Sequence, residues 1–175
     1  MRCLMLLRHA KSVSADPGTR DFDRPLDARG RKDAPKIGAY MARHALLPDQ
    51  VLVSTAKRTR ETWALAAAAF PTTTPVVFDD RLYEAGHNAI FKMIKETAAA
   101  THSLLLLGHN PGLHKLAMLL IAAGDVDARE RLHEELPTAG LVTIDFPLDD
   151  WSKLHPHSGR LDRFVSPRSL KMATD

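Results

Sequence analysis

Short apolar runs of strand length constrain this chain more than any other feature of its sequence. Leu4–Leu7 and Leu104–Leu107 contain no polar side chain, and each run is followed two residues later by a histidine. An uninterrupted apolar strand has to be covered on both faces, which is typical of parallel sheets lying between two helical layers. We therefore expect these runs to be central strands of a buried sheet.

Strand-like runs alternate with segments of helical periodicity along the chain. Asp27 is expected to cap the first of the helices. The alternation predicts an α/β fold, a three-layer α/β/α sandwich around a mainly parallel central sheet. The predicted strands are Arg2–Leu7, Gln50–Ser54, Pro75–Phe78, Ser103–Leu107 and Leu141–Phe146, and the predicted helices are 29–45, 56–70, 88–100, 113–122 and 127–136.

The composition is that of an ordinary globular domain. Of the 175 residues 45% are hydrophobic and 26% are charged, and we expect one domain over residues 1–168 with a disordered tail over 169–175. Apolar runs are all far shorter than the roughly 18 residues that a membrane-spanning helix needs, so we expect a soluble, cytoplasmic protein with no membrane partner. The lone cysteine, Cys3, excludes an internal disulfide and a cysteine-based zinc site.

Positive charge is concentrated in the first third of the chain. Residues 1–60 carry 13 Lys and Arg against 6 Asp and Glu, whereas residues 61–159 carry 7 against 13. This asymmetry favours an anionic ligand. Only 6% of the residues are aromatic, which leaves few side chains on which nucleic acid bases could stack. We therefore expect no nucleic acid partner.

Basic side chains follow several of the predicted strands. Arg8 and His9 come directly after the first strand, Arg58 comes four residues after Ser54, and His109 follows the leucine-rich strand. Ligands of such sheets bind beyond the carboxyl ends of the strands, so these side chains should converge on one edge. Because the planar arginine fork matches phosphoryl oxygens, the sequence predicts a phosphate pocket there.

Other kinds of site are disfavoured by the residues that surround the histidines. Arg8 next to His9 would repel a metal cation, so we expect no metal. The chain has no Gly-x-Ser-x-Gly elbow for a serine nucleophile, and it has neither glycine-rich loop that anchors nucleotides. We therefore expect no cofactor.

The residues at these strand ends carry a resemblance to a known family. Their order and spacing resemble the histidine phosphatase superfamily, and the resemblance implies the phosphoglycerate mutase-like fold. The short length and the Asp21–Leu26 segment are similar to its small SixA-type phosphohistidine phosphatases. Two positions depart from the pattern: Ala10 stands where the family commonly has Gly, and Thr55 where it commonly has Pro. The matching segments are Arg8-His9-Ala10-Lys11-Ser12, Arg58, Leu82-Tyr83-Glu84 and Leu107-Gly108-His109-Asn110-Pro111.

The resemblance also implies roles for particular residues. His9 would be the nucleophile, forming a phosphohistidine that water then hydrolyses. Arg8, Arg58 and His109 would surround the transferring oxygens and stabilise the transition state, so that no metal is required. Glu84 would donate a proton to the leaving group, although a solvated loop carboxylate is its alternative interpretation.

Further residues of these segments have two interpretations each. Ser12 would add a hydrogen bond to phosphate or belong to a solvated loop. Asn110 would donate to the phosphoryl group or shape the turn that follows, and we favour the turn. Three charged residues either line the mouth of the site or form a surface ion-pair cluster: Asp21, Asp23 and Arg24.

Three functions remain open from the sequence. The first is a phosphatase acting on phosphohistidine in a protein, and the second is a phosphatase of small phosphomonoesters such as sugar phosphates. A catalytically idle phosphate-binding module is the third, against which the intact His9 argues. The short chain has few insertions to enclose a small substrate, which favours the first. The expected partner is a phosphorylated protein or a small phosphate ester, and the oligomeric state is left open.

Overall fold

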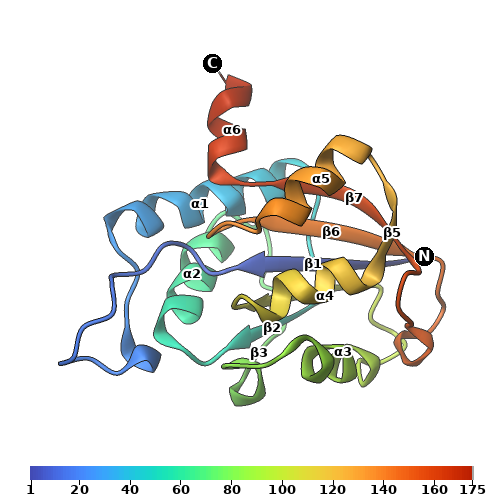
Figure 1. Ribbon diagram of the computed structural model, residues 1–175, viewed down its shortest axis with the longest axis horizontal. Coiled ribbons are helices and arrows are strands. Elements are labelled where there is room, and N and C mark those ends of the chain that lie inside the picture. Colours follow the sequence, from blue (N-terminus) through green and yellow to red (C-terminus); the bar gives the residue numbers. More distant parts are fainter. Residues whose placement is uncertain (175) are drawn as a thin grey trace.

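A single seven-stranded sheet forms the centre of the computed structural model, which describes residues 1–174, with the side chains of residues 1–172 (Figure 1). The strands lie in the order β3-β2-β4-β1-β6-β7-β5. Only β6 runs antiparallel to its neighbours within this sheet, so the predicted mainly parallel sheet is confirmed. The strands are β1 Arg2–Arg8, β2 Gln50–Ser54, β3 Val76–Asp79, β4 Ser103–Gly108, β5 Ile121–Gly124, β6 Leu141–Phe146 and β7 Gly159–Val165.

Helices cover both faces of the sheet, as the sequence predicts. Figure 1 shows α1 and α2 on one side and α3, α4 and α5 on the other. Single 3-10 turns, η1 to η3, lie in the connections. The bounds are α1 Ala28–Arg43, α2 Lys57–Ala67, α3 His87–Lys95, α4 Gly112–Leu120, α5 Val126–Glu134, α6 Pro167–Thr174, η1 Asp21–Asp23, η2 Asp80–Leu82 and η3 Trp151–Lys153.

The consecutive leucines of β4 serve two separate cores. Leu105 and Leu107 belong to the cluster that includes Ile37 of α1, whereas Leu104 and Leu106 belong to the cluster that includes Leu116 of α4. Successive side chains of a strand point to opposite faces, so four leucines in a row supply both layers. All four are fully buried, and the predicted double coverage is confirmed.

The register between β1 and β4 places the two histidines of the sequence at the same edge of the sheet. The strands pair in parallel from Cys3 opposite Ser103 to Arg8 opposite Gly108. Each strand therefore ends at the same level, and the next residue of each is a histidine, His9 or His109. This pairing builds the candidate site.

The structure differs from the sequence-based prediction in three places. Residues 169–174, expected to be disordered, belong to α6. At the start of this helix the backbone N–H of Ser166 donates to the hydroxyl of Ser169, and the N–H of Ser169 donates to the hydroxyl of Ser166. Leu170 is partly buried against the core. Residue 175 lies outside the described residues. Ile121 was predicted to be helical but begins β5, because it pairs with β7, a strand that the sequence did not show. The expected helix 88–100 ends at Lys95.

None of the helices described for residues 1–174 is both long and apolar enough to cross a membrane.

Close contact between α1 and α2, the helix that carries Arg58, gives a test of their packing. A Cβ atom on Gly38 of α1 would lie 2.1 Å from the main-chain oxygen of Ala66 in α2. We expect Gly38→Ala to lower the free energy of unfolding by about 2 kcal/mol through overpacking, although Ala is the better helix former by about 1 kcal/mol. Urea unfolding measures the change. Gly86→Ala, where a Cβ meets nothing within 4 Å, is the control, and a Gly38 variant as stable as that control would contradict the packing.

Candidate active site

Four of the predicted site residues meet at the carboxyl ends of β1, β2 and β4. Arg8 is the last residue of β1, and the N–H of His9 donates to the main-chain oxygen of Gly108 at 3.1 Å. Arg58 lies in the first turn of α2, directly beyond β2. The rings of His9 and His109 lie with their centroids 5.4 Å apart. The structure therefore brings two imidazoles and two guanidinium groups together.

His9 is held in one tautomer by its own loop. Its Nδ1 atom lies 2.7 Å from the main-chain oxygen of Ala10, so Nδ1 carries the proton and donates it to that carbonyl. The N–H of Ala10 in turn donates to the hydroxyl of Thr62, which itself donates to the main-chain oxygen of Arg58. Nε2 of His9 is left with a free electron pair, which is the requirement for a nucleophile.

The surroundings keep His9 uncharged. Burial, together with the nearby His109, Arg58 and Arg8, lowers the pKa of its imidazole to about 3, against the opposing hydrogen bond to Ala10. Only 7% of the residue is exposed. At neutral pH the ring is a neutral base lying beside two permanent cations, so it can attack an anionic phosphoryl group that those cations hold.

The contact between His109 and Ser54 is compatible with the same tautomer as that of His9, with the proton on Nδ1. Nε2 of His109 lies 2.8 Å from the hydroxyl oxygen of Ser54, and that hydroxyl also accepts a weak hydrogen bond of 3.4 Å from the N–H of Ala56. Ser54 can then donate its own proton to Nε2, which leaves the proton of His109 on Nδ1. Burial and the charge of Arg58 lower the pKa of His109 to about 4. Nδ1–H of a neutral ring is thus free to donate to an oxygen of a ligand.

Several buried polar atoms of the site have no partner among the described residues. They include Nε of Arg8, Nε of Arg58 and Nδ1 of His109. Their neighbouring atoms are anchored: Nη1 of Arg8 donates to the main-chain oxygen of Leu136 at 3.1 Å. Buried donors without acceptors cost free energy, and an oxyanion between them would supply the acceptors. The donor set fits a tetrahedral anion.

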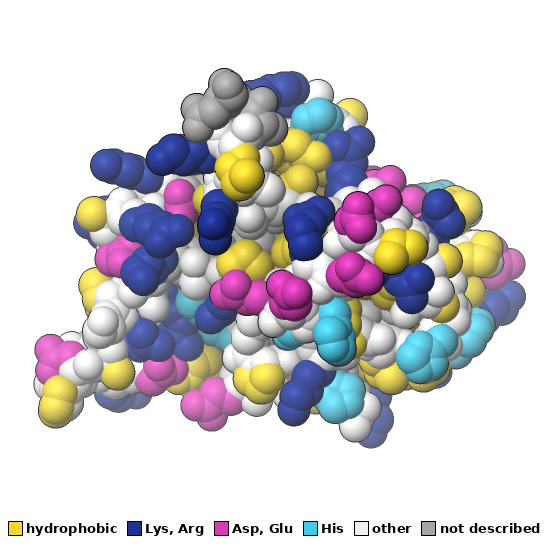
Figure 2. Space-filling view, turned by 45° about the horizontal axis from the view of Figure 1, so that its top comes forward, with side chains coloured by type: hydrophobic (Ala, Val, Ile, Leu, Met, Phe, Trp, Pro, Cys, Tyr) yellow, Lys and Arg dark blue, Asp and Glu magenta, His cyan; other side chains and the backbone are white. Residues whose placement is uncertain are grey.

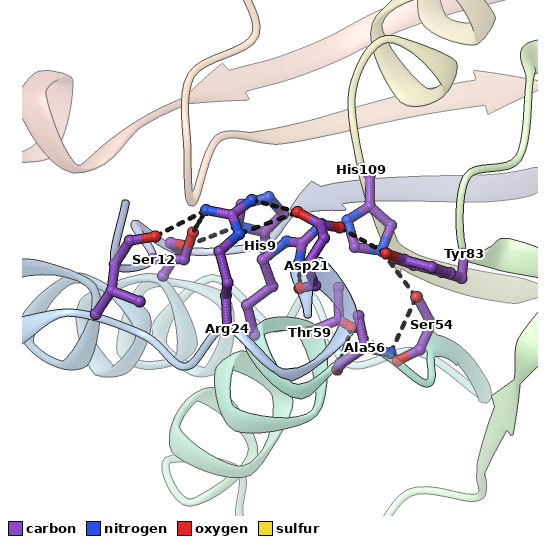
Figure 3. A network of polar contacts seen from close by, with 12 residues as sticks. His9, Ser12, Asp21, Arg24, Ser54, Ala56, Thr59, Tyr83 and His109 are labelled. Carbon is purple, nitrogen blue, oxygen red and sulfur yellow. Dashed lines mark hydrogen bonds and ion pairs between the residues drawn. The ribbon is translucent and has the colours of Figure 1, made fainter. Parts of the chain in front are cut away.

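Asp21 connects the basic groups to the mouth of the site (Figure 3). Its carboxylate accepts hydrogen bonds from Tyr83 at 2.6 Å, from Arg24 at 2.8 Å and from Arg58 at 3.1 Å. These three donors, with the hydrogen bond from Tyr83 first, hold the pKa of Asp21 well below its usual range. The prediction offered two roles for Asp21, and its place between Arg58 and solvent, with 49% of the side chain exposed, is that of a residue of the mouth.

Ser12, Asn110 and Glu84 occupy the periphery of the site. Figure 3 shows Ser12 beside Arg24, whose guanidinium donates to its hydroxyl at 3.1 Å. Nδ2 of Asn110 donates to the main-chain oxygen of Leu136, the same atom that Arg8 contacts, so this amide group ties the loop to its neighbour. Glu84 is exposed and has a left-handed backbone with φ of 59°.

A cavity of about 320 Å³ opens above these residues. Its lining includes Arg58, His109 and Tyr83 together with the carboxylates of Asp21 and Glu84. The cavity therefore joins the basic groups to a more acidic rim.

Sequence reasoning missed three residues that orient the site. Ser54 lies within hydrogen-bond distance of Nε2 of His109, Thr62 anchors Ala10, and Tyr83 packs edge-on against the His109 ring at 5.7 Å between centroids. Ser54 is a polar residue at the carboxyl end of an apolar strand, which is a usable signal. Thr62 and Tyr83 give no comparable signal, because their contacts depend on how α2 and the loop after η2 are placed.

The two histidines do not belong to a metal-binding cluster. Across the part of the chain that the structure describes, no group of three His, Cys, Asp or Glu side chains is arranged to hold a metal ion. The charges of Arg8 and Arg58 lower the pKa of both rings, and the same charges would repel a cation. The donor set does not fit a metal.

Comparison with known proteins agrees with this geometry. Residues 4–129 match the family model of the histidine phosphatase superfamily, branch 1. The uncharacterised protein Rv1276c of Mycobacterium tuberculosis is 33% identical over 164 residues, covering 93% of this chain and all of that protein. The crystal structure of a candidate phosphohistidine phosphatase SixA from Agrobacterium tumefaciens has a TM-score of 0.77 at 31% identity, covering 95% of this chain and 98% of the other. Its counterpart from Nakamurella multipartitia gives 0.82 at 26% identity, with coverage of 95% and 96%.

The chain therefore belongs to the histidine phosphatase superfamily, and its fold is the phosphoglycerate mutase-like fold. Ala10, one of the two departures from the family pattern, is fully buried and has no positive φ, so the backbone there does not need glycine. The superfamily membership identifies the class of chemistry as phosphatase chemistry.

The low pKa values of the two histidines predict how stability depends on pH. Both rings stay neutral in the fold down to about pH 4, whereas in the unfolded chain they take up protons below about 6.5. Between these limits the unfolded chain binds more protons, so acid destabilises the fold. As the pH falls from 7 to 5, we expect the proton uptake of each of these histidines in the unfolded chain to lower the free energy of unfolding by about 2 kcal/mol.

Urea unfolding of the wild type and of His9→Asn at pH 7, 6 and 5 measures this effect. The free energy of unfolding of the variant should fall less steeply with falling pH than that of the wild type. His133→Asn, at an exposed position on α5, should keep the dependence of the wild type. Equal slopes for all three proteins would contradict a buried neutral His9.

Proposed function

We propose that this protein hydrolyses phosphohistidine in other proteins, through a phosphoryl intermediate on His9. Nε2 of His9 attacks phosphorus, the new N–P bond forms, and the P–N bond to the substrate imidazole breaks with its electron pair leaving on that imidazole. Water then attacks the phosphoryl group on His9, releasing inorganic phosphate and returning the electron pair to Nε2. Nδ1 of His9 keeps its proton throughout, because the main-chain oxygen of Ala10 accepts a hydrogen bond from it.

Arg8, Arg58 and His109 stabilise the transferring oxygens. The two guanidinium groups are permanent cations, and Nδ1–H of His109 is a neutral donor oriented by Ser54. Removing one such donor typically costs about 2.7–4 kcal/mol of transition-state stabilisation. With two cations supplying the charge, the proposed reaction needs no metal ion.

The observation that carries the phosphohistidine assignment is the ionised Asp21 at the rim of the cavity. Three donors keep this carboxylate charged, so it is unsuited to protonating an alkoxide leaving group. Its negative charge instead favours a substrate whose phosphorylated imidazole is protonated and therefore cationic. Such a ring leaves as a neutral imidazole. Carboxylated phosphate esters would be repelled at the same place. The SixA assignments of the two related structures support the same substrate class.

A phosphatase of small phosphomonoesters is the second candidate, and Glu84 is the observation that favours it. Its left-handed backbone costs about 1–2 kcal/mol in a residue other than glycine, and such strain is often found at functional sites. The side chain lines the cavity, where it could protonate an alkoxide. An idle phosphate-binding module is less well supported, since binding alone requires no buried neutral imidazole.

A substrate panel tests the proposed activity. The wild type should hydrolyse a phosphohistidine peptide faster than a sugar phosphate, and His9→Ala should lose all turnover, because the nucleophile is removed. Denaturing gels at alkaline pH should show a phosphoryl adduct on the wild type alone, and circular dichroism checks that the variant is folded. Activity should be unchanged by a chelator. Turnover by a folded His9→Ala protein would falsify the assignment of the nucleophile, and loss of activity with EDTA that zinc or magnesium restores would remove the metal-free mechanism.

Two carboxylate variants distinguish the leaving groups. Glu84→Gln should lower kcat/KM for alkyl phosphates about a hundredfold, because a general acid is lost, and should change phosphoramidate hydrolysis little. Asp21→Asn keeps an acceptor for Tyr83 but removes the charge, so phosphohistidine hydrolysis should fall about fivefold relative to para-nitrophenyl phosphate. Steady-state kinetics on the three substrates measures both ratios. If each variant slows all substrates equally, neither carboxylate acts on the leaving group.

A further inference from the structure

Basic side chains of α1 and α6 line a groove that leads to the active site. We call it the α1–α6 groove. It consists of two adjoining cavities of about 460 and 710 Å³, which share Arg29, Pro167 and Arg168. Figure 2 shows Lys and Arg side chains gathered around the base of α6 and over α1. The basic residues of the first cavity are Arg29, Lys32, Lys36, Arg168 and Lys171.

The charge of the first cavity is strongly positive. Asp33 is the one carboxylate among its described lining residues, against five Lys and Arg. Its side chain is only 8% exposed, and it pairs with Arg29 at 3.5 Å. The charge that faces solvent is therefore that of the cations. Clustered charges of one sign in a groove raise the local concentration of ligands of the opposite sign.

The second cavity connects this positive region to the reaction centre. Its lining runs from Arg168 to Arg8, the guanidinium that belongs to the candidate phosphate site. Glu134, the last residue of α5, and Glu135, which follows it, line the same cavity as Arg8, and Figure 2 shows Asp and Glu side chains on the α5 side. The path from groove to site is thus basic at its far end and mixed in charge at its near end.

We infer that the α1–α6 groove binds an acidic segment of the phosphorylated protein substrate, while the phosphohistidine itself enters beside Arg8. This inference rests on the proposed function. Arg29 and Lys36 are seven residues apart on α1, which is about 10 Å, the length of about three residues of extended peptide. Two or more Asp or Glu side chains of such a segment would face the basic side chains of the groove, among them Lys32, Lys36 and Arg168.

The lining of the groove favours a protein segment over nucleic acid. A continuous phosphate backbone running to Arg8 would have to pass Glu134 and Glu135, which repel it, whereas a peptide carries carboxylates only where its sequence places them. Phe164 is the aromatic side chain of the described lining, and the guanidinium of Arg131 already lies over its ring at 5.3 Å. Bases would find no free stacking surface in this lining.

Matched peptides test the inference. Four phosphohistidine peptides of equal length carry four Glu or four Gln within six residues of the phosphohistidine, on its N-terminal or on its C-terminal side. The wild type should show a KM about fivefold lower for a Glu peptide, with kcat unchanged, since exposed ion pairs contribute modestly and add up. The difference should shrink as salt is raised. Lys32→Glu combined with Arg168→Glu should abolish the preference and leave turnover of para-nitrophenyl phosphate unchanged.

The control variant combines Lys92→Glu in α3 with Lys153→Glu in η3, which makes the same change of net charge on other elements. It should keep the preference for the Glu peptide. Fluorescence anisotropy with the unphosphorylated Glu and Gln peptides measures the groove without any turnover, so failure of the phosphohistidine activity is distinguishable from failure of the groove. Equal binding of the two peptides, equal loss in both charge-reversed variants, or tighter binding of a single-stranded oligonucleotide to the same groove would each overturn the inference.

Discussion

The hydrogen bond from Nδ1 of His9 to the main-chain oxygen of Ala10 is the interaction on which the chemistry of this protein depends. An imidazole beside two guanidinium groups loses its proton readily, but losing charge alone does not determine which nitrogen is free. The Ala10 carbonyl makes that choice, because it accepts from Nδ1 and leaves Nε2 as the base. Thr62 holds Ala10 in place from α2, so the helix that carries Arg58 also orients His9, the proposed nucleophile.

Charge is graded from the interior of the site to its surroundings. Arg8 and Arg58 lie innermost, and their charges lower the pKa of both histidines. The carboxylates of Asp21 and Glu84 line the cavity beside Arg58, and the basic groove between α1 and α6 adjoins the separate cavity beside Arg8. A phosphoryl group attached to a cationic leaving group, within a segment that carries acidic side chains, would match these two surroundings. Substrate selection would then rest on electrostatics at several distances from phosphorus.

The sequence was a good guide where burial dictates residue type. The leucine runs of β1 and β4 need cover on both faces, so their place in the sheet follows from their composition. It was a poor guide where an element exists only because of its partner. β5 is four residues long and is a strand only because it pairs with β7, and α6 depends on Ser166 and on Leu170 packing against the core. Local patterns carry little of that information, since the stabilising contacts are distant along the chain.

Sequence alone determined that Arg8, His9, Arg58 and His109 lie at or just beyond the carboxyl ends of strands, and parallel strands bring those ends to one edge. Tertiary structure decided how these groups act. The tautomers of the two histidines depend on Ala10 and Ser54, and the ionisation of Asp21 depends on Tyr83, Arg24 and Arg58. The physical reason is that protonation responds to burial and to hydrogen bonds of a few ångströms, which distant segments supply only when the chain is folded.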